Sequence, residues 1–206
     1  HVLHGDDYVL PGFYATVAAA AERHPEIDFF ATRALVVDEH DALETVSARA
    51  PSLEDGSRDA RAFYYDNPFR TPSVVIRRTH YERTGGFDPR LVHVADWEMW
   101  VRAIRSGGGL AINEALGAYR VFAGNHTSRL VRTGEGLRDH LRMADLWEAA
   151  GAPGFSAARF RRWIVTTARL RMQHFAETGD REAARDNRRL WWEIGSTREK
   201  LAHLAR

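Results

Sequence analysis

The chain has 206 residues, of which 44% are hydrophobic, and this is enough apolar material for a substantial buried core. No apolar run approaches the roughly 18 residues of a membrane span, and the N-terminus lacks the pattern of a signal peptide. The absence of cysteine excludes disulfides and thiolate metal sites, so carboxylates and imidazoles remain as metal ligands.

The net charge of +1 conceals two regions of opposite sign. Residues 1–128 hold 13 Lys and Arg against 18 Asp and Glu, whereas residues 129–206 hold 16 against 10. A basic region of this kind can face nucleic acid or an anionic membrane surface. Charges of both signs are interspersed, which favours a solvated face of arginine-rich helices. No nucleic-acid-binding module accompanies the charge, so we expect no nucleic-acid partner.

The first segment with side chains suited to ligand binding lies near the start of the chain. It is His4-Gly5-Asp6-Asp7, which follows the apolar pair Val2-Leu3. We interpret Val2 and Leu3 as the end of a buried strand, and Pro11 as the opening of a helix. Open α/β sheets bind ligands at the carboxyl ends of their strands, so the two carboxylates form a candidate site for a divalent cation and a phosphate. The alternative is a turn or a helix cap, because Asp pairs are common in both.

The next elements alternate between helix and strand. Apolar spacing predicts a helix over residues 13–24, ended by Pro25, and β-forming residues predict a strand over 27–37. Residues 38–70 contain several breakers and predict a long connection with partial helix. A buried strand is expected over 73–76, followed by a brief helix over 80–83 that Thr79 caps.

The second half of the chain becomes increasingly helical. Trp97, Trp100, Val101 and Ile104 recur at helical spacing, which predicts an amphipathic helix that starts at Asp96 and ends at Gly107. Two short strands are expected over 110–112 and 118–121. From about residue 137 the pattern is helical, with an αα-hairpin at residues 178–180.

Several segments together resemble a known family. They are residues 4–13, TPSVVIRR over 71–78, YERTGGFD over 81–88, ADWEMW over 95–100, and Tyr119-Arg120. In order and approximate spacing they resemble the second half of a family 2 glycosyltransferase of the GT-A fold, and GGFD and DWxxW are the specific part. The resemblance spans about residues 1–128.

This resemblance implies an α/β fold with a partial GT-A (nucleotide-diphospho-sugar transferase) sheet and flanking helices in residues 1–128, followed by an all-α region in 129–206. Family members begin with a βαβ region that binds the nucleotide, and this chain shows none of it. We therefore expect a fragment of a longer polypeptide, poorly stable alone because strands that would cover a sheet edge are missing.

The resemblance also implies a metal site. The family's Asp-x-Asp motif maps to His4-Gly5-Asp6, so Asp6 is expected to be the main ligand and Asp7 the second, with His4 in place of the first aspartate. His126 lies near the position of a late histidine in related enzymes and is a further candidate ligand. The expected ion is Mg²⁺ or Mn²⁺, which would stabilise the leaving diphosphate.

Asp96 occupies the position of the family's catalytic base, although Ala95 stands where the family usually has Glu. A carboxylate here would accept the proton of the acceptor hydroxyl. The alternative is that Asp96 caps the helix that follows.

Substrate contacts are expected from residues around this position. Trp97 and Trp100 would line the acceptor pocket, with core packing as the alternative, and Gly85-Gly86 would shape a turn beside it. Arg77 and Arg120 would pair with diphosphate oxygens, with surface ion pairs as the alternative.

The function implied is that of an inverting, divalent-metal-dependent glycosyltransferase, inactive as this fragment. Its donor would be a nucleotide-diphosphate sugar, and its acceptor a hydroxyl on a glycan, a lipid-linked sugar or a small molecule. The alternative is a non-catalytic glycosyltransferase-like fragment that binds sugar, a partner protein or a membrane surface through the basic helices 137–206. The expected location is cytoplasmic, with peripheral contact at the inner face of the membrane.

Overall fold

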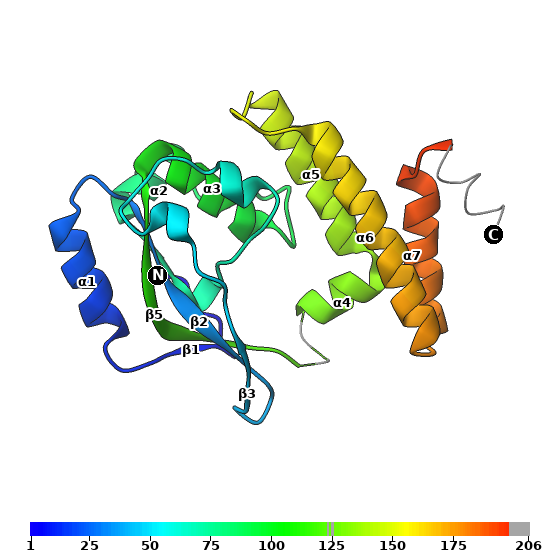
Figure 1. Ribbon diagram of the computed structural model, residues 1–206, viewed down its shortest axis with the longest axis horizontal. Helices are drawn as coiled ribbons and strands as arrows, with labels where there is room; N and C mark the ends of the chain where they lie inside the picture. The colour runs from blue at the N-terminus through cyan, green and yellow to red at the C-terminus, as the bar shows by residue number, and fades with distance from the viewer. Residues whose placement is uncertain (123, 125, 198–206) are drawn as a thin grey trace. The chain divides into compact units, whose positions relative to one another are not determined.

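The computed structural model describes residues 1–122, 124 and 126–197, and the chain forms two compact units. The first unit contains His1–Asp88 and Ala95–Phe122, and the second contains Pro89–Val94 and Ala123–Arg206. Figure 1 shows the sheet within the first unit and the helices of the second. The segment Pro89–Val94 therefore belongs to the helical unit although it lies between two parts of the first.

The first unit is organised around a five-stranded mixed sheet. Its order is β1-β5-β2-β3, and β4 also pairs with β2. β2 and β5 are parallel, and the other pairs are antiparallel. The strands are β1 (Tyr8–Val9), β2 (Phe29–Val37), β3 (Leu43–Val46), β4 (Val74–Ile76) and β5 (Gly109–Arg120).

β5 joins the two strands predicted over 110–112 and 118–121. Its pairing with β2 shifts register, because Thr32 lies opposite Ile112 while Arg33 lies opposite Ala115. Such an irregularity accommodates extra residues and bends the strand without ending the pairing. The sequence between the two predicted strands is therefore a bulge within one long strand.

Three helices complete the first unit: α1 (Phe13–Arg23), α2 (Arg78–Thr84) and α3 (Ala95–Gly107). They confirm the three helices predicted there. α1 packs against β2, and α3 packs against both β2 and β5. The prediction that Thr79 caps α2 was wrong, because α2 begins earlier, after Arg77, and no side chain caps it.

The expected strand at the start of the chain was also wrong. Val2 and Leu3 are exposed and lie outside any strand, and β1 follows the acidic pair instead of preceding it. Residues 38–70 contain strand β3 and two short 3₁₀ turns, Pro51–Leu53 and Arg61–Tyr64. β3 is mostly exposed and is held by its pairing with β2. The hydrophobicity of its own residues therefore does not predict a strand.

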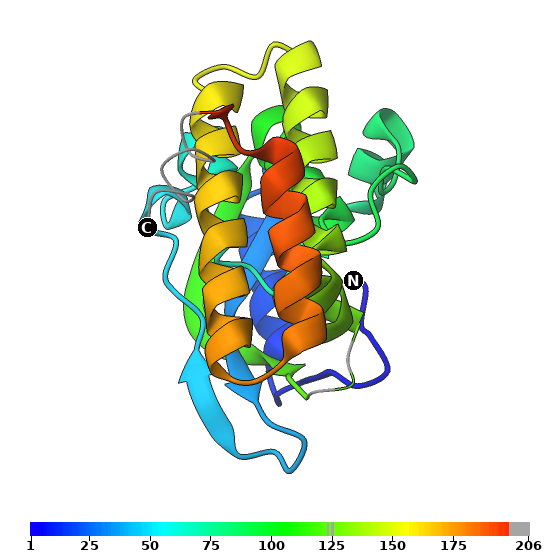
Figure 2. The same ribbon diagram turned by 90° about the vertical axis from the view of Figure 1, so that its right-hand side faces the viewer.

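Apart from Pro89–Val94, most of the described part of the second unit is helical. Its helices are α4 (His126–Thr133), α5 (Glu135–Ala149), α6 (Ala157–Glu177) and α7 (Arg181–Ile194). α6 packs against both α5 and α7, and the three run side by side in Figure 2. The predicted αα-hairpin is confirmed, since Asp180 begins α7 by accepting the backbone N–H of Ala183 at 3.2 Å.

Buried side chains from all four helices form the core of the second unit. They include Leu130, Leu137, Met143, Phe160, Ile164, Leu190 and Trp191. Among the described residues, no helix combines the length and apolarity needed to cross a membrane. The predicted fold class is thus confirmed at the level of a mixed sheet with flanking helices followed by a helical C-terminal region.

Candidate functional site

The acidic segment near the N-terminus forms a tight turn. The backbone N–H of Asp7 reaches the carbonyl of His4 at 3.2 Å. One ligand atom from each of His4, Asp6 and Asp7 lies within 4.8 Å of the others. His4 and Asp6 are exposed, and exposed acidic groups often gather without a metal ion, so this grouping alone does not establish a metal site.

Asp7 differs from its neighbours because its side chain is only 1% exposed. One oxygen, Oδ1, accepts the backbone N–H of Arg120 at 2.9 Å. The other, Oδ2, is buried and has no hydrogen-bond partner in the described chain, and His4 Nδ1 lies 3.6 Å away, beyond hydrogen-bond range. A buried carboxylate oxygen without a partner is costly.

Burial is the main cause that raises the pKa of Asp7, and the negative charge of Asp6 adds to it. The hydrogen bond from Arg120 opposes the shift. A cation bound at the unpaired oxygen would relieve both the burial cost and the repulsion between the two carboxylates. The donor set is therefore chemically suited to a hard divalent ion.

The sheet fixes the position of this turn. β1 pairs with β5 so that Tyr8 lies opposite Ala118 and Val9 opposite Gly117. Gly117 admits close packing, because a Cβ there would lie 2.9 Å from the Cβ of Ser73. Asp7 immediately precedes β1 and therefore faces the end of β5, where Arg120 lies.

Asp96 lies in the first turn of α3 and accepts two hydrogen bonds. Its Oδ1 receives the backbone N–H of Trp97 at 2.7 Å, and its Oδ2 receives the hydroxyl of Thr71 at 3.3 Å. An N-cap side chain accepts from the second or third helical residue, whereas Asp96 accepts from the residue that follows it. Capping therefore does not account for this geometry.

Burial raises the pKa of Asp96, while its two hydrogen bonds and the positive charges of His4 and Arg70 oppose the shift. Thr71, which donates to Asp96, opens a turn that packs against β1 and β5, and β1 directly follows Asp7. The turn that holds the acidic group and the first turn of α3 lie in one region of the first unit. A carboxylate with a raised pKa is better suited to accept a proton near neutral pH.

Sequence reasoning missed two residues beside Asp96. Thr71 is buried and donates its hydroxyl to this carboxylate, and Arg70 places its guanidinium over the ring of Tyr119 at 5.9 Å. Thr71 and Pro72 open a 3₁₀ turn, Thr71–Ser73, that leads into β4. The hydroxyl was visible in the sequence, but its partner depends on a contact between residues distant in the chain.

Trp97 and Trp100 both pack in the core of the first unit. Trp97 is 7% exposed and donates its indole N–H to the carbonyl of Phe63 at 2.6 Å. Trp100 is 2% exposed, and its ring lies 5.9 Å from those of Phe29 and Phe87. Core packing, the alternative interpretation, describes both residues in this structure.

The guanidinium of Arg77 is hydrogen-bonded to backbone carbonyls around the C-terminus of α1. Its guanidinium donates to Ala21 at 2.7 Å, to His24 at 3.2 Å and to Ile27 at 2.6 Å. These bonds satisfy carbonyls that a helix end leaves without partners. Binding of a diphosphate by Arg77 would require these bonds to be exchanged.

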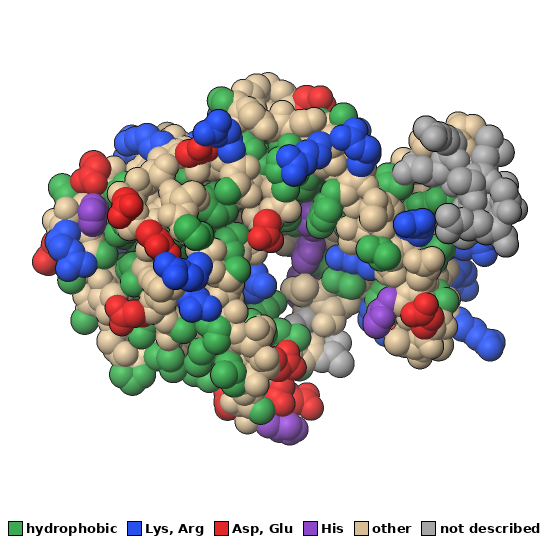
Figure 3. Space-filling model, viewed as in Figure 1, with side chains coloured by type: hydrophobic (Ala, Val, Ile, Leu, Met, Phe, Trp, Pro, Cys, Tyr) green, Lys and Arg blue, Asp and Glu red, His purple; other side chains and the backbone are tan. Residues whose placement is uncertain are grey.

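Arg120 joins the acidic turn to the turn between β2 and β3. Its guanidinium donates to the carbonyl of Asp6 at 2.9 Å, to the carbonyl of Asp38 at 3.0 Å and to the carboxylate of Asp41 at 2.8 Å. Acidic side chains gather over that second turn in Figure 3. Arg120 therefore orders the surroundings of Asp7, and its predicted contact with diphosphate stays a prediction.

The remaining predicted residues lie in different settings. Gly85 ends α2 with a φ of 81°, which glycine favours, and a Cβ at Gly85 or Gly86 would meet nothing within 4 Å. His126 is the first residue of α4 in the second unit, where it is exposed and lies 3.2 Å from the guanidinium of Arg129. Its predicted role as a metal ligand stays a prediction.

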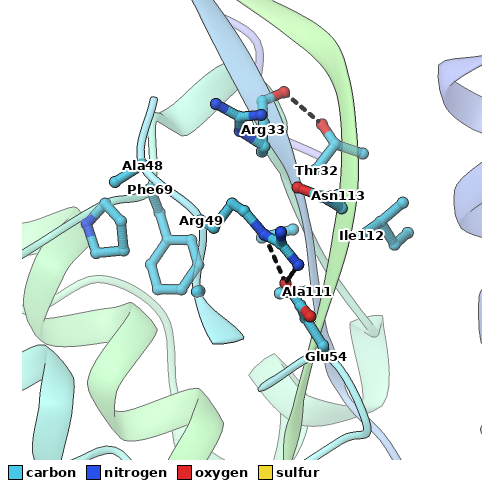
Figure 4. A pocket seen from close by; sticks show the side chains of 12 residues that line it. Thr32, Arg33, Ala48, Arg49, Glu54, Phe69, Ala111, Ile112 and Asn113 are labelled. Carbon is cyan, nitrogen blue, oxygen red and sulfur yellow. Dashed lines mark hydrogen bonds and ion pairs between the residues drawn. The ribbon is translucent and has the colours of Figure 1, made fainter. Parts of the chain in front are cut away.

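A separate cavity lies beside the bulge in β5. It is about 10 Å³ in volume, room for about one water molecule. In Figure 4, Arg49 reaches across to Glu54 on its wall, and Phe69 lines another side. The cavity is too small for a sugar.

Asp28, His80 and Arg83 form a second cluster of titratable groups that sequence reasoning missed. Asp28 Oδ2 accepts from His80 Nδ1 at 3.0 Å and from Arg83 at 2.5 Å, and His80 is fully buried. Burial opposes ionisation, but these hydrogen bonds hold the pKa of Asp28 below its usual value. A Cβ at Gly107 would lie 2.1 Å from Asp28 Oδ2, so the cluster also needs glycine there.

No family model and no curated protein sequence matches this chain.

Proposed function

We propose that residues 1–128 are the C-terminal half of a GT-A glycosyltransferase domain of family 2 type. The reaction is transfer of a sugar from a nucleotide-diphosphate sugar to a hydroxyl acceptor with inversion. The observation that carries the proposal is the convergence of two distant motifs: Asp96 accepts a hydrogen bond from Thr71, and the turn that Thr71 opens packs against β1, the strand that directly follows Asp7. Transfer at the anomeric carbon of a sugar requires one group that stabilises the leaving diphosphate and another that accepts the proton of the attacking hydroxyl.

Asp6 and Asp7 are the residues that would hold Mg²⁺ or Mn²⁺, with His4 at the edge of the group. When bound, the ion would neutralise charge on the leaving diphosphate. The unpaired Oδ2 of Asp7 supports this assignment, because it is a buried hard ligand without a hydrogen-bond partner among the residues described.

Asp96 acts as the general base in this proposal. The acceptor oxygen forms a bond to the anomeric carbon as the bond from that carbon to the diphosphate oxygen breaks, and Asp96 takes the hydroxyl proton. The hydrogen bonds from Trp97 and Thr71 orient the carboxylate for this task. Burial raises its pKa and so increases its basicity.

The test is release of nucleoside diphosphate by the whole glycosyltransferase domain that contains residues 1–128, from a panel of nucleotide-diphosphate sugars, with Mn²⁺ and with chelator. Release that needs the metal and is lost in Asp96→Asn supports the proposal. Asp55→Asn is the matched control, since Asp55 is an exposed carboxylate elsewhere in the first unit. Silence toward every donor, or equal release by Asp96→Asn, contradicts it.

The alternative function is binding without catalysis through the basic helices, and one observation favours it. A groove of about 570 Å³ lies between α6 and α7. Its lining combines small apolar side chains with three arginines: Met172, Gln173, Ala176, Arg181, Ala184, Arg185 and Arg188. This lining suits an anionic partner. Binding of anionic vesicles that is lost in Arg185→Gln, together with silence toward donors, would favour this alternative.

A further inference from the structure

The groove of the second unit lies between the last turns of α6 and the first turns of α7. Its volume is about 570 Å³, and the two helices that form it pack against each other. Its apolar lining consists of Met172, Ala176 and Ala184, of which Ala176 is exposed and the other two are half-buried. Small side chains leave room for a side chain from another molecule, and the flexible thioether of Met172 can adapt to it.

Three arginines of α7 line the same groove. They are Arg181, Arg185 and Arg188, and all three are exposed. Their spacing of i, i+4 and i+7 places them on one face of the helix, over about 10 Å of its length. The groove therefore combines a row of positive charges with an apolar lining.

The acidic residues within this part of α7 lie on a different face. Glu182 and Asp186 each follow an arginine by one residue, and one residue turns an α-helix by about 100°. Arg185 Nε lies 3.8 Å from Asp186 Oδ1, but an exposed pair of this kind contributes little. Arg181 and Arg188 make no ion pair with any residue that the structure describes.

The carboxylates at the ends of the two helices are also directed elsewhere. Asp180, which caps α7, pairs with Arg132 of α4, and Glu193 pairs with Arg138 of α5. Glu177, the acidic residue of α6, does not line the groove. An acidic partner could therefore bind the groove without breaking any of these pairs.

The shape of this surface favours a protein segment over a membrane. Peripheral membrane helices insert large apolar side chains beside their basic residues. The apolar residues here are alanine and methionine, and they line a hollow. A helix that carries carboxylates at i, i+4 and i+7 repeats the spacing of the arginines, and an amphipathic helix is a common occupant of a groove between helices.

We propose that this groove docks an acidic amphipathic helix of a partner protein. The carboxylates of the partner pair with Arg181, Arg185 and Arg188, whose planar guanidinium groups suit two-point contacts with carboxylates. Its apolar side chains fill the space over Ala176 and Ala184. This docking does not depend on the proposed glycosyl transfer, because every residue of the groove belongs to the second unit.

The test is fluorescence anisotropy of a labelled helical peptide of about 18 residues, titrated with the whole chain. The peptide carries Glu at i, i+4 and i+7 and has Leu and Ala on the neighbouring face. A matched peptide has Gln in place of each Glu. The acidic peptide is expected to bind saturably, and the Gln peptide at least ~10-fold more weakly, because it cannot pair with the arginines.

Three variants locate the binding. Arg185→Gln should weaken binding of the acidic peptide at least ~10-fold, as expected for an arginine at the centre of an interface. Arg78→Gln makes the same change of charge at an exposed residue of α2 in the first unit and should bind as the wild type does. Ala176→Trp fills the groove but keeps all three arginines, and it should also weaken binding at least ~10-fold.

Equal binding of the two peptides, equal effects of Arg78→Gln and Arg185→Gln, or full affinity in Ala176→Trp overturns the proposal. Sedimentation with phosphatidylcholine vesicles, with and without phosphatidylserine, tests a membrane surface as the occupant. Arg185-dependent binding to the anionic vesicles without saturable peptide binding assigns the groove to a membrane and also overturns the proposal. No sugar donor enters these measurements, so their outcome is distinct from that of the transfer assay.

Discussion

Asp7 and Arg120 are joined by a hydrogen bond of 2.9 Å from the backbone N–H of Arg120 to Oδ1 of Asp7. This bond uses one carboxylate oxygen and leaves the other buried without a hydrogen-bond partner in the residues that the structure covers. It also ties the N-terminal turn to the end of the longest strand of the sheet. The position of the proposed metal ligand is therefore set by the sheet and not by the loop alone.

Replacement of Asp7 by Asn should weaken Mn²⁺ binding at least ~10-fold, because it removes the charge and one hard ligand oxygen. Electron paramagnetic resonance of free and bound Mn²⁺ measures the affinity. Asp55→Asn should bind as the wild type does. Equal affinity for the three proteins would place the ion elsewhere, for example at the acidic turn between β2 and β3.

In the whole glycosyltransferase domain that contains this chain, Asp96→Asn should lower transfer by about 100-fold or more, which is the usual contribution of a general base. The folded protein should nevertheless remain intact, since an amide oxygen can still accept the Trp97 N–H. The pKa of Asp96 is raised by burial, so the folded state holds its proton more tightly than the unfolded state does. Wild-type stability therefore falls as pH rises from the ordinary carboxyl pKa through the raised one.

The Asp96→Asn variant lacks this loss of stability with rising pH. Its melting temperature should equal the wild-type value at low pH and exceed it at pH 7. Differential scanning calorimetry across this range measures the difference, and a variant that melts lower at pH 7 would show that the carboxylate stabilises the fold.

Asp28→Asn should destabilise the first unit by about 2 kcal/mol, because His80 and Arg83 lose a charged acceptor. The pKa of Asp28 is held down in the folded state, so its stabilisation is present above the unfolded pKa of about 4 and is lost as pH falls through the folded value. Urea unfolding at pH 7 and at low pH measures both effects. Asp55→Asn is the control, since Asp55 is an exposed carboxylate of the first unit and its loss should leave the urea midpoint unchanged.

Asp139→Ala should destabilise the second unit by about 3 kcal/mol or more, because three backbone N–H groups lose the buried carboxylate that accepts their hydrogen bonds. Hydrogen exchange at Val92, His93 and Val94 reports the loss directly. Asp145→Ala removes an exposed carboxylate from the same helix and should leave exchange at these residues unchanged. Unaltered exchange in Asp139→Ala would contradict the assignment of Asp139 as the anchor of this segment.

Helices with strong local patterns could be predicted from the sequence. The spacing of Trp97, Trp100 and Ile104 predicts α3, and Gly179-Asp180 predicts the α6–α7 hairpin, because each signal lies within a few residues. Strand β1 could not be placed, since it depends on its pairing with β5 near the other end of the unit. The contacts of the site residues likewise depend on residues that lie far apart in the sequence.

For the site, carboxylates could be recognised from the motifs, but their partners could not. Asp96 and the acidic turn were singled out by their resemblance to a family, and their shared location depends on the folded sheet, through the turn that Thr71 opens. Thr71 gains its role only through a contact across the unit. Arg77 and Arg120 looked like anion ligands, yet both donate to acceptors within the protein, because helix and strand ends present carbonyls that the sequence does not reveal.

The most direct test of the central claim is paramagnetic broadening of backbone amide signals by Mn²⁺. If the acidic turn and Asp96 form one site, substoichiometric Mn²⁺ should broaden the signals of Asp7, Arg120 and Trp97 together, and Asp7→Asn should abolish this pattern. Broadening that spares Trp97, or that is unchanged in Asp7→Asn, would contradict the account.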